Sequence, residues 1–275
     1  MIIWLTSYPK SGNTWVRLFL NSLIYLRNEP IDINNIKIQQ FPNKKHFKNF
    51  VKDVGSISEL VKNYTNAQSF LNLDQKIKFL KTHSANWTTE EYSFTDNINT
   101  TGTIYIVRDP RNIITSVKNH YQKESYEEAL EFMINEKKFI GSKFVKEEFN
   151  VPTLISSWSN HYNSWKKLKK NYLLIKYENL LNNPLEEFFK ITSFVEKILN
   201  INLSEKNVVK AIDNCNFEKL QKQEENKGFV ESPDKKLHKF FFLGPNNDWK
   251  KILDDRILNK IETHFEKEMK ELEYL

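Results

Sequence analysis

The 275-residue sequence contains very little cysteine and no long apolar run. Its single cysteine, Cys215, cannot form an intrachain disulfide and excludes every cysteine-rich zinc pattern. The six histidines show no HExxH or similar metal-ligand spacing. No stretch approaches the roughly 20 apolar residues of a membrane-spanning helix, and the N-terminus lacks the features of a signal peptide. We therefore expect a cytoplasmic protein without a membrane span.

A large excess of charge of one sign is also missing. The chain has 41 basic and 35 acidic residues, a net charge of +6, which suits an anionic ligand without requiring nucleic acid. We find no linker, internal repeat or low-complexity tract, so we predict a single domain over residues 1–275. No heptad seam or dimer segment indicates an oligomeric state.

Short β-like runs alternate with helical patterns along the chain. The runs are Met1–Ser7, Ile77–Lys81, Thr103–Val107 and Tyr172–Lys176. Apolar runs of this length between helices predict an α/β fold with a parallel sheet covered on both faces. Ligands bind at the carboxyl ends of the strands in such sheets, so we expect functional residues directly after each run.

The remaining elements are predicted from periodicity and from proline and glycine. Helices are expected over Thr14–Leu26, Asn112–Lys123, Tyr126–Asn135, Thr153–Lys169, Pro184–Leu199 and Asp255–Glu273. Residues 29–55 are interpreted as an irregular excursion. Residues 224–247 are expected to form a long loop that acts as a lid or a binding segment, with disorder as the alternative.

The strongest motif is Tyr8-Pro-Lys-Ser-Gly-Asn-Thr-Trp15, which lies between the first strand and a helix. Backbone N–H groups at a helix N-terminus bind phosphate or sulfate, and Gly12 permits close approach of the anion. Lys10 adds a positive charge, while Ser11 and Thr14 add hydroxyl donors. Walker A loops place Lys-Ser/Thr after the second glycine, so this loop is of a different type.

Polar residues also follow the next two predicted strands. Lys81 and His83 follow one strand, and Arg108 follows the other, with Ser116 on the helix beyond it. A histidine beside an anion loop is a candidate general base, because its ordinary pKa lies near 6.5.

Together these segments resemble the sulfotransferases that use 3′-phosphoadenosine 5′-phosphosulfate (PAPS). YPKSGNTW, LKTHSANW and YIVRDPRNIITSVKNHY are similar to the family's three main motifs, and LLIKYENLLNNP and CNFEKLQKQEENKGF are weaker matches. The resemblance implies a P-loop-like three-layer α/β fold, with a central parallel sheet flanked by helices. It also implies transfer of a sulfuryl group from PAPS to a hydroxyl or amine of a small-molecule, carbohydrate or lipid-like acceptor.

The resemblance also implies a role for each matching residue. His83 would be the general base, with Lys10 and Lys81 stabilising the transferring group. No metal is expected, because a sulfuryl group carries less negative charge than a phosphoryl group. The residues expected to bind PAPS are Lys10, Ser11, Gly12, Asn13, Thr14, Trp15, Arg108, Ser116, Tyr177, Phe217 and Gly244.

One departure from the family pattern concerns the 3′-phosphate. The family's Arg-Lys-Gly is replaced by Phe242-Leu243-Gly244, so two expected cations are missing. Four basic residues of the same loop are candidates to replace them: Lys235, Lys236, His238 and Lys239.

The acceptor site is less well defined by the sequence. Its candidate aromatic residues are Trp87, Tyr121, Phe139 and Phe144. Two other functions remain open: a P-loop kinase for small molecules, which would bind ATP more tightly with Mg²⁺, and a catalytically silent nucleotide-binding protein.

Overall fold

The computed structural model describes residues 1–26, 29–141, 151–168, 170–232 and 239–275. By its contacts the chain divides into two compact units. Unit 1 comprises Met1–Pro9, Ile38–Ile106 and Asn135–Leu174, and unit 2 comprises Lys10–Lys37, Val107–Ile134 and Ile175–Leu275. That the whole chain is a single domain stays a prediction. Over the described residues, no helix combines the length and the apolarity needed to cross a bilayer.

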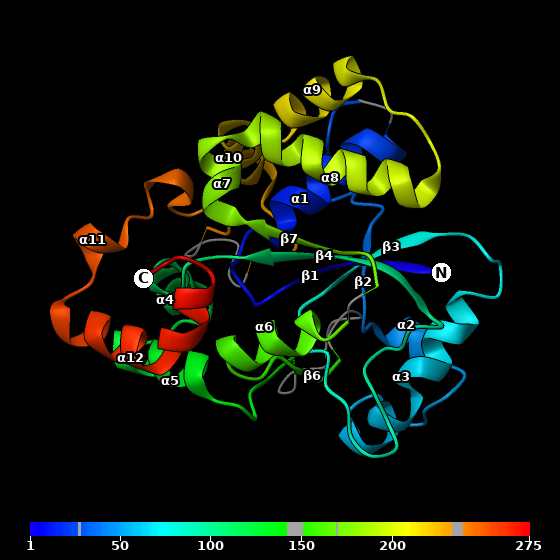
Figure 1. The fold of residues 1–275 in the computed structure, drawn as a ribbon, viewed down its shortest axis with the longest axis horizontal. Helices are drawn as coiled ribbons and strands as arrows, with labels where there is room; N and C mark the ends of the chain where they lie inside the picture. The colour runs from blue at the N-terminus through cyan, green and yellow to red at the C-terminus, as the bar shows by residue number, and fades with distance from the viewer. Residues whose placement is uncertain (27–28, 142–150, 169, 233–238) are drawn as a thin grey trace. The chain divides into compact units, whose positions relative to one another are not determined.

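Most of a five-stranded sheet belongs to unit 1 (Figure 1). Its strand order is β2 (Gln39–Gln40), β3 (Lys78–Thr82), β1 (Ile2–Ser7), β4 (Thr100–Val107) and β7 (Tyr172–Lys176). The pairs β2–β3, β3–β1 and β1–β4 are parallel, and every residue of β1 is buried. Burial of β1 on both faces explains why its sequence begins with a continuous apolar run. The predicted α/β class, with a central parallel sheet flanked by helices, is confirmed.

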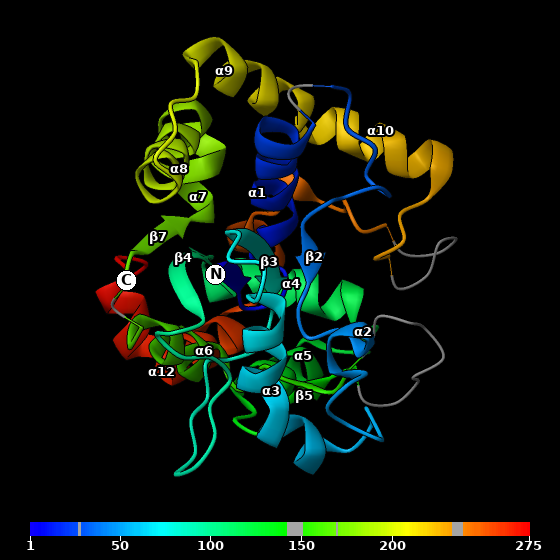
Figure 2. The same cartoon turned by 90° about the vertical axis from the view of Figure 1, so that its right-hand side faces the viewer.

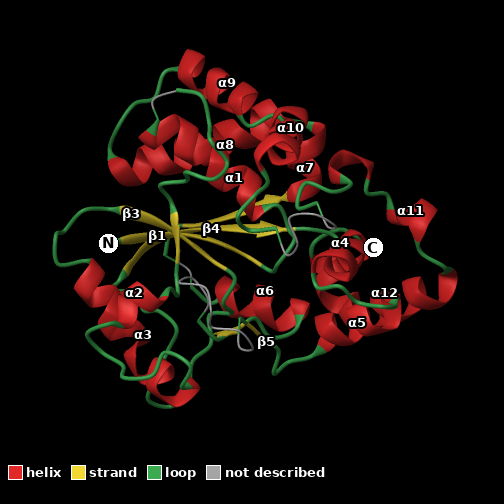
Figure 3. Ribbon diagram, turned by 180° about the vertical axis from the view of Figure 1, so that it is seen from behind, coloured by secondary structure: helices red, strands yellow, loops and turns green. Residues whose placement is uncertain are grey.

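Within unit 1, α3 (Ile57–Leu71) and α6 (Trp158–Lys166) lie on one face of this sheet (Figures 1 and 3). On β1, the ring of Trp4 contacts Phe41, Phe94 and Trp165 at centroid distances of 5.4–6.0 Å. This aromatic cluster joins the strand to the loops and helix that cover it. Burial of such large rings supplies much of the apolar area of the core.

The predicted helix Thr153–Lys169 is wrong in its first turn. Residues Thr153–Leu154 form β6, which pairs antiparallel with β5 (Phe139–Ile140). The helix begins at Trp158, where the Ser157 side chain accepts a hydrogen bond from the Asn160 N–H. Pairing with a distant segment therefore overrode the local helical pattern.

Unit 2 contains α1 (Asn13–Leu20), which continues as the π-helical turn η1 (Asn21–Tyr25). Figure 2 shows α1 below α9 (Glu205–Asn214), and α9 contacts both α1 and η1. The predicted helix Pro184–Leu199 is confirmed as α8, which contacts α9 and α7 (Tyr177–Asn182). Its first residue is a proline, which needs no N–H partner at that position.

A second group of helices in unit 2 surrounds α4 (Pro110–His120). Contacts join α4 to α5 (Tyr126–Ile134), to α11 (Trp249–Ile252) and to α12 (Asp255–Glu271) (Figure 3). The predicted helices in these regions are confirmed to within three residues at each end, as helix boundaries usually are.

Several elements were not predicted. Residues 29–55 contain the short strand β2 and a four-residue helix, α2 (Lys44–Phe47). The helices α3, α9 and α10 (Phe217–Lys227) were also missed. Because α10 ends at Lys227, the predicted loop over residues 224–247 is helical at its start, and it contains a 3₁₀ turn at Gly244–Asn246.

Candidate active site

In unit 2 the loop before α1 has the backbone geometry of an anion cradle. Lys10 and Gly12 both have positive φ angles, 69° and 95°. Gly12 is the N-cap residue, and a glycine has no side chain that could cap the first N–H groups of α1. The Ser11 hydroxyl is buried and has no hydrogen-bond partner among the described residues. Donors of this kind at a helix N-terminus fit a phosphate or sulfate group.

Gly12 is required for a reason that the sequence did not reveal. A Cβ atom at this position would lie 2.4 Å from Cδ2 of Tyr177. Non-bonded carbon atoms do not approach each other this closely, and the positive φ disfavours any residue other than glycine. The glycine therefore lets the Tyr177 ring pack directly on the loop, whatever the loop binds.

Arg108 joins several of the predicted binding residues. Its Nη1 donates to the Lys10 carbonyl at 3.1 Å and lies 3.5 Å from the Ser116 hydroxyl. Its guanidinium lies 4.3 Å from the centroid of the Tyr177 ring. The residue is buried, and Nε has no hydrogen-bond partner among the described residues. A fixed guanidinium with an unused donor, beside a hydroxyl and a phenol, fits a second phosphate group.

Two further predicted residues, Trp15 and Tyr177, are in contact. Their ring centroids are 6.1 Å apart, and Trp15 also contacts Phe188 at 5.5 Å. Burial raises the pKa of Tyr177, so its phenol stays protonated and can donate a hydrogen bond at neutral pH. Trp15 thus has a packing role, which leaves its predicted contact with adenine a prediction.

Phe217 and Gly244, which were predicted separately, form a pair in unit 2. Gly244 has a φ of 52°, and a Cβ there would lie 2.2 Å from Cζ of Phe217. The first residue of α10 therefore holds the 3₁₀ turn at Gly244–Asn246 in place.

Asn13 and Thr14 are both buried in the first turn of α1.

The Lys10 ammonium has an aromatic neighbour that the sequence did not predict. Nζ lies 4.0 Å from the centroid of the Phe240 ring. The backbone N–H groups of Phe240 and Phe241 donate to the Glu224 carboxylate at 2.7 and 2.8 Å. Glu224 on α10 therefore fixes the segment that contacts Lys10.

Four basic residues were predicted as candidates to replace the two missing cations at the 3′-phosphate. Lys239 forms an ion pair with Glu225 at 2.8 Å. Lys235, Lys236 and His238 lie outside the described residues.

In unit 1, His83 lies directly after β3. Its Nδ1 is 2.9 Å from the Ser7 carbonyl oxygen and 3.4 Å from the Ser7 hydroxyl. Because a carbonyl oxygen only accepts hydrogen bonds, we assign the proton to Nδ1. The lone pair is then on Nε2, which is the tautomer that a general base requires. Lys81, on β3, is 5% exposed.

A second histidine of unit 1, His161 on α6, holds the backbone of His83. Its Nε2 donates to the His83 carbonyl at 3.2 Å, and its Nδ1 accepts from the Tyr105 hydroxyl at 2.8 Å. Burial lowers the pKa of His161 to about 3, so the ring is neutral. Trp165 adds a hydrogen bond from its indole N–H to the Ser84 carbonyl at 2.8 Å. Neither His161 nor Trp165 was predicted from the sequence to contact this loop.

Unit 1 also contains an apolar pocket of about 160 Å³. Two of the predicted acceptor-side aromatics, Trp87 and Phe139, line it. The pocket adjoins the loop that carries His83, because the carbonyl of its lining residue Leu154 accepts the Ala85 N–H at 2.8 Å.

The other two acceptor-side candidates are Tyr121 and Phe144. Tyr121 is in unit 2, where it stacks on Phe132 with a centroid distance of 4.4 Å. Phe144 lies outside the described residues.

The chain is similar in sequence to known sulfotransferases. It is 26% identical to sulfotransferase 1 family member D1 of Mus musculus over 98% of this chain and 83% of that protein. It is 24% identical to flavonol 3-sulfotransferase of Flaveria bidentis over 94% of this chain and 79% of that protein.

Solved structures share the fold. A mouse sulfotransferase complexed with PAP aligns with a TM-score of 0.61 at 22% identity, covering 98% of this chain and 84% of that one. Retinol dehydratase in complex with androsterone and PAP aligns with a TM-score of 0.63 at 18% identity, covering 98% and 80%. The sulfotransferase domain family model matches residues 2–273. The chain therefore belongs to the sulfotransferase family and is a sulfotransferase enzyme.

Proposed function

We propose that this sulfotransferase uses PAPS as its donor and that unit 2 binds the nucleotide. The observation that carries the proposal is the convergence of Arg108 with Lys10, Ser116 and Tyr177. Two donors in this region, Ser11 Oγ and Arg108 Nε, are buried without a partner among the described residues, as expected for groups that bind an anion. The loop before α1 would bind the 5′-phosphate, and Arg108, Ser116 and Tyr177 would bind the 3′-phosphate.

The catalytic residues of the proposal are His83, Lys10 and Lys81. PAPS, when bound, supplies the sulfuryl group, whose bond to the bridging oxygen breaks as the acceptor oxygen or nitrogen bonds to sulfur. His83 Nε2 takes the proton from the attacking group. The Lys10 ammonium stabilises the negative charge that develops on the bridging oxygen, and Lys81 stabilises the transferring group.

For the acceptor we propose a small molecule with an apolar body and a hydroxyl or amine. The pocket in unit 1 is lined by aliphatic and aromatic side chains, including Leu60, Val61, Tyr64, Trp87 and Phe139. Such a lining favours binding of apolar rings or chains. Two relatives are named flavonol 3-sulfotransferase and luciferin sulfotransferase, and these names are consistent with a small-molecule acceptor.

The test is transfer of radiolabelled sulfate from PAPS to a panel of phenols, alcohols and amines. We expect turnover of at least one apolar acceptor by the wild-type protein. His83→Ala should lower kcat by about 100-fold or more, as removal of a general base does. His264→Ala, which removes an exposed histidine on α12, is the matched control and should leave kcat unchanged. PAP binding without turnover of any acceptor would instead favour a silent nucleotide-binding protein.

A further inference from the structure

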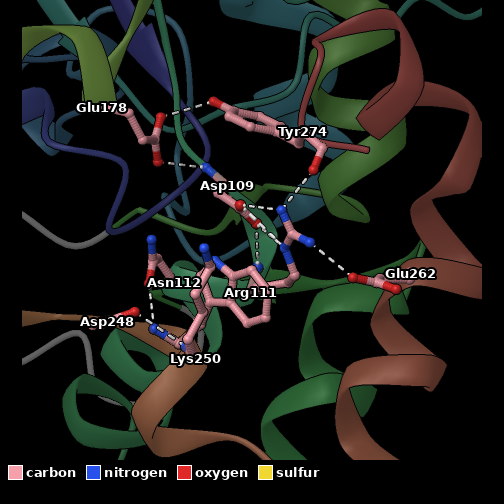
Figure 4. A network of polar contacts seen from close by, with 9 residues as sticks. Asp109, Arg111, Asn112, Glu178, Asp248, Lys250, Glu262 and Tyr274 are labelled. Carbon is pink, nitrogen blue, oxygen red and sulfur yellow. Dashed lines mark hydrogen bonds and ion pairs between the residues drawn. The ribbon is translucent and has the colours of Figure 1, made fainter. Parts of the chain in front are cut away.

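A polar network in unit 2 includes Glu178, the second residue of α7 (Figure 4). Glu178 Oε1 accepts the backbone N–H of Asp109 at 2.9 Å, and Oε2 accepts the Tyr274 hydroxyl at 2.9 Å. The carboxylate therefore links α7 to the start of α4 and to the segment that follows α12.

Arg111 fixes the other side of the same network. Its Nε and Nη2 donate to the Asp109 carboxylate at 2.7–3.1 Å, and Nη1 donates to Glu262 at 2.7 Å. Nη2 also donates to the backbone carbonyl of Tyr274 at 2.7 Å. The guanidinium lies 4.1 Å from the centroid of the Trp249 ring. Tyr274 is thus held by its carbonyl as well as by its hydroxyl.

The network lies next to the two residues that form the proposed 3′-phosphate site. Arg108 directly precedes Asp109, and Tyr177 directly precedes Glu178. The hydrogen bond from the Asp109 backbone N–H to the Glu178 carboxylate therefore ties α7 to the start of α4, beside the point where the Arg108 guanidinium stacks on the Tyr177 ring. A shift of either backbone would misplace one partner of that stack.

From this arrangement we propose that Tyr274 is a positioning residue for the 3′-phosphate site, acting through Glu178 on Arg108 and Tyr177. The inference rests on the proposed function. A guanidinium and a phenol that are already in place lose little rotamer freedom when the phosphate binds, which raises affinity. Tyr274 would act on these residues through the hydroxyl that it donates to Glu178.

The test compares two nucleotides that differ only in the 3′-phosphate, PAP and adenosine 5′-monophosphate, by calorimetry on the full chain. Tyr274→Phe keeps the ring and removes the hydroxyl that donates to Glu178. We expect the Kd for PAP to rise about fivefold to tenfold, which is less than the full effect of one hydrogen bond to a charged group, because Tyr274 acts on the phosphate site through Glu178. The Kd for adenosine 5′-monophosphate should stay within about twofold.

Two further variants sharpen the test. Glu178→Gln changes the acceptor of the Tyr274 hydrogen bond instead of its donor. It should also reduce the preference for PAP over adenosine 5′-monophosphate. Glu273→Gln removes the exposed ion pair of Glu273 with Lys176, at 3.2 Å, and should leave both Kd values unchanged.

The outcomes separate this inference from the proposed function. Equal weakening of both nucleotides by Tyr274→Phe would show a general structural role and overturn the inference, as would no change in either. If the wild-type protein binds no PAP, the proposed function fails, and the inference falls with it.

Discussion

The Tyr177 ring occupies the space that a side chain at Gly12 would need, since a Cβ on Gly12 would lie 2.4 Å from Tyr177 Cδ2. Gly12→Ala must therefore displace the ring and hold an alanine at a φ of 95°. We expect it to lower the free energy of unfolding by about 1–3 kcal/mol and to weaken PAP binding at least tenfold. Denaturant unfolding and calorimetry measure the two effects.

The matched control for that variant is Gly55→Ala. A Cβ at Gly55 would lie 3.1 Å from the end of the flexible Asp53 side chain, and no positive φ is involved. Its effect on stability should be below about 0.5 kcal/mol. Equal behaviour of the two alanine variants would contradict the role given to the Gly12–Tyr177 contact.

Arg108→Lys tests whether a planar guanidinium is needed in unit 2. Lysine keeps the positive charge but loses the fork that donates to the Lys10 carbonyl and stacks on Tyr177. The Kd for PAP should rise by tenfold or more. Arg256→Lys, an exposed arginine on α12, serves as control and should bind PAP as the wild type does. An unchanged Kd for PAP in Arg108→Lys would exclude a bidentate contact between the Arg108 guanidinium and the 3′-phosphate.

The apolar pocket of unit 1 can be filled from α3. Val61→Phe adds an aromatic ring to the pocket lining, so we expect the KM for apolar acceptors to rise about tenfold while the Kd for PAP stays the same. Val209→Phe, on the exposed surface of α9, is the control. Steady-state kinetics measure the KM of both variants. An unaltered KM for Val61→Phe would mean that acceptors bind outside this pocket.

His161 should make the protein sensitive to acid. Its pKa is about 3 in the folded state, because burial disfavours the imidazolium, against about 6.5 in the unfolded chain. The unfolded state therefore binds more protons between these pH values. The contribution of neutral His161 to the free energy of unfolding is complete above pH 6.5. It falls by up to about 1.4 kcal/mol per pH unit as the pH drops toward 3.

His161→Gln should remove this part of the pH dependence. Denaturant unfolding at a series of pH values between 7 and 4 measures it, with His264→Gln as the exposed control. Identical pH profiles for His161→Gln and the wild type would show that the pKa of His161 is the same in the folded and the unfolded protein.

The parts of the fold that the sequence predicted are those with a local signal. β1 and β4 are buried on both faces, so their apolar runs were visible without any knowledge of their partners. The two-residue strand β2 depends on its pairing with β3 and carries no such run. Helix α10 is largely polar and has few buried residues, so its periodicity is weak.

Helix α3 was missed for a different reason. Its N-terminus carries a capping signal, because the Ser56 side chain accepts the Glu59 N–H and Glu59 stands three residues later. This signal was available in the sequence and would have identified the start of the helix.

The same distinction applies to the site. The residues near Lys10 and Arg108 belong to contiguous motifs, so the sequence could name them. Phe240, His161 and Tyr274 act through contacts with segments far away in the chain, at separations that no short motif records. Only the tertiary structure could assign them a role.

Calorimetric titration of the wild-type protein with PAP tests the central claim most directly. The arrangement of Lys10, Arg108, Ser116 and Tyr177 predicts saturable binding of one PAP per chain, weakened by Arg108→Lys. Absence of binding, or binding of ATP with Mg²⁺ in preference to PAP, would contradict the account.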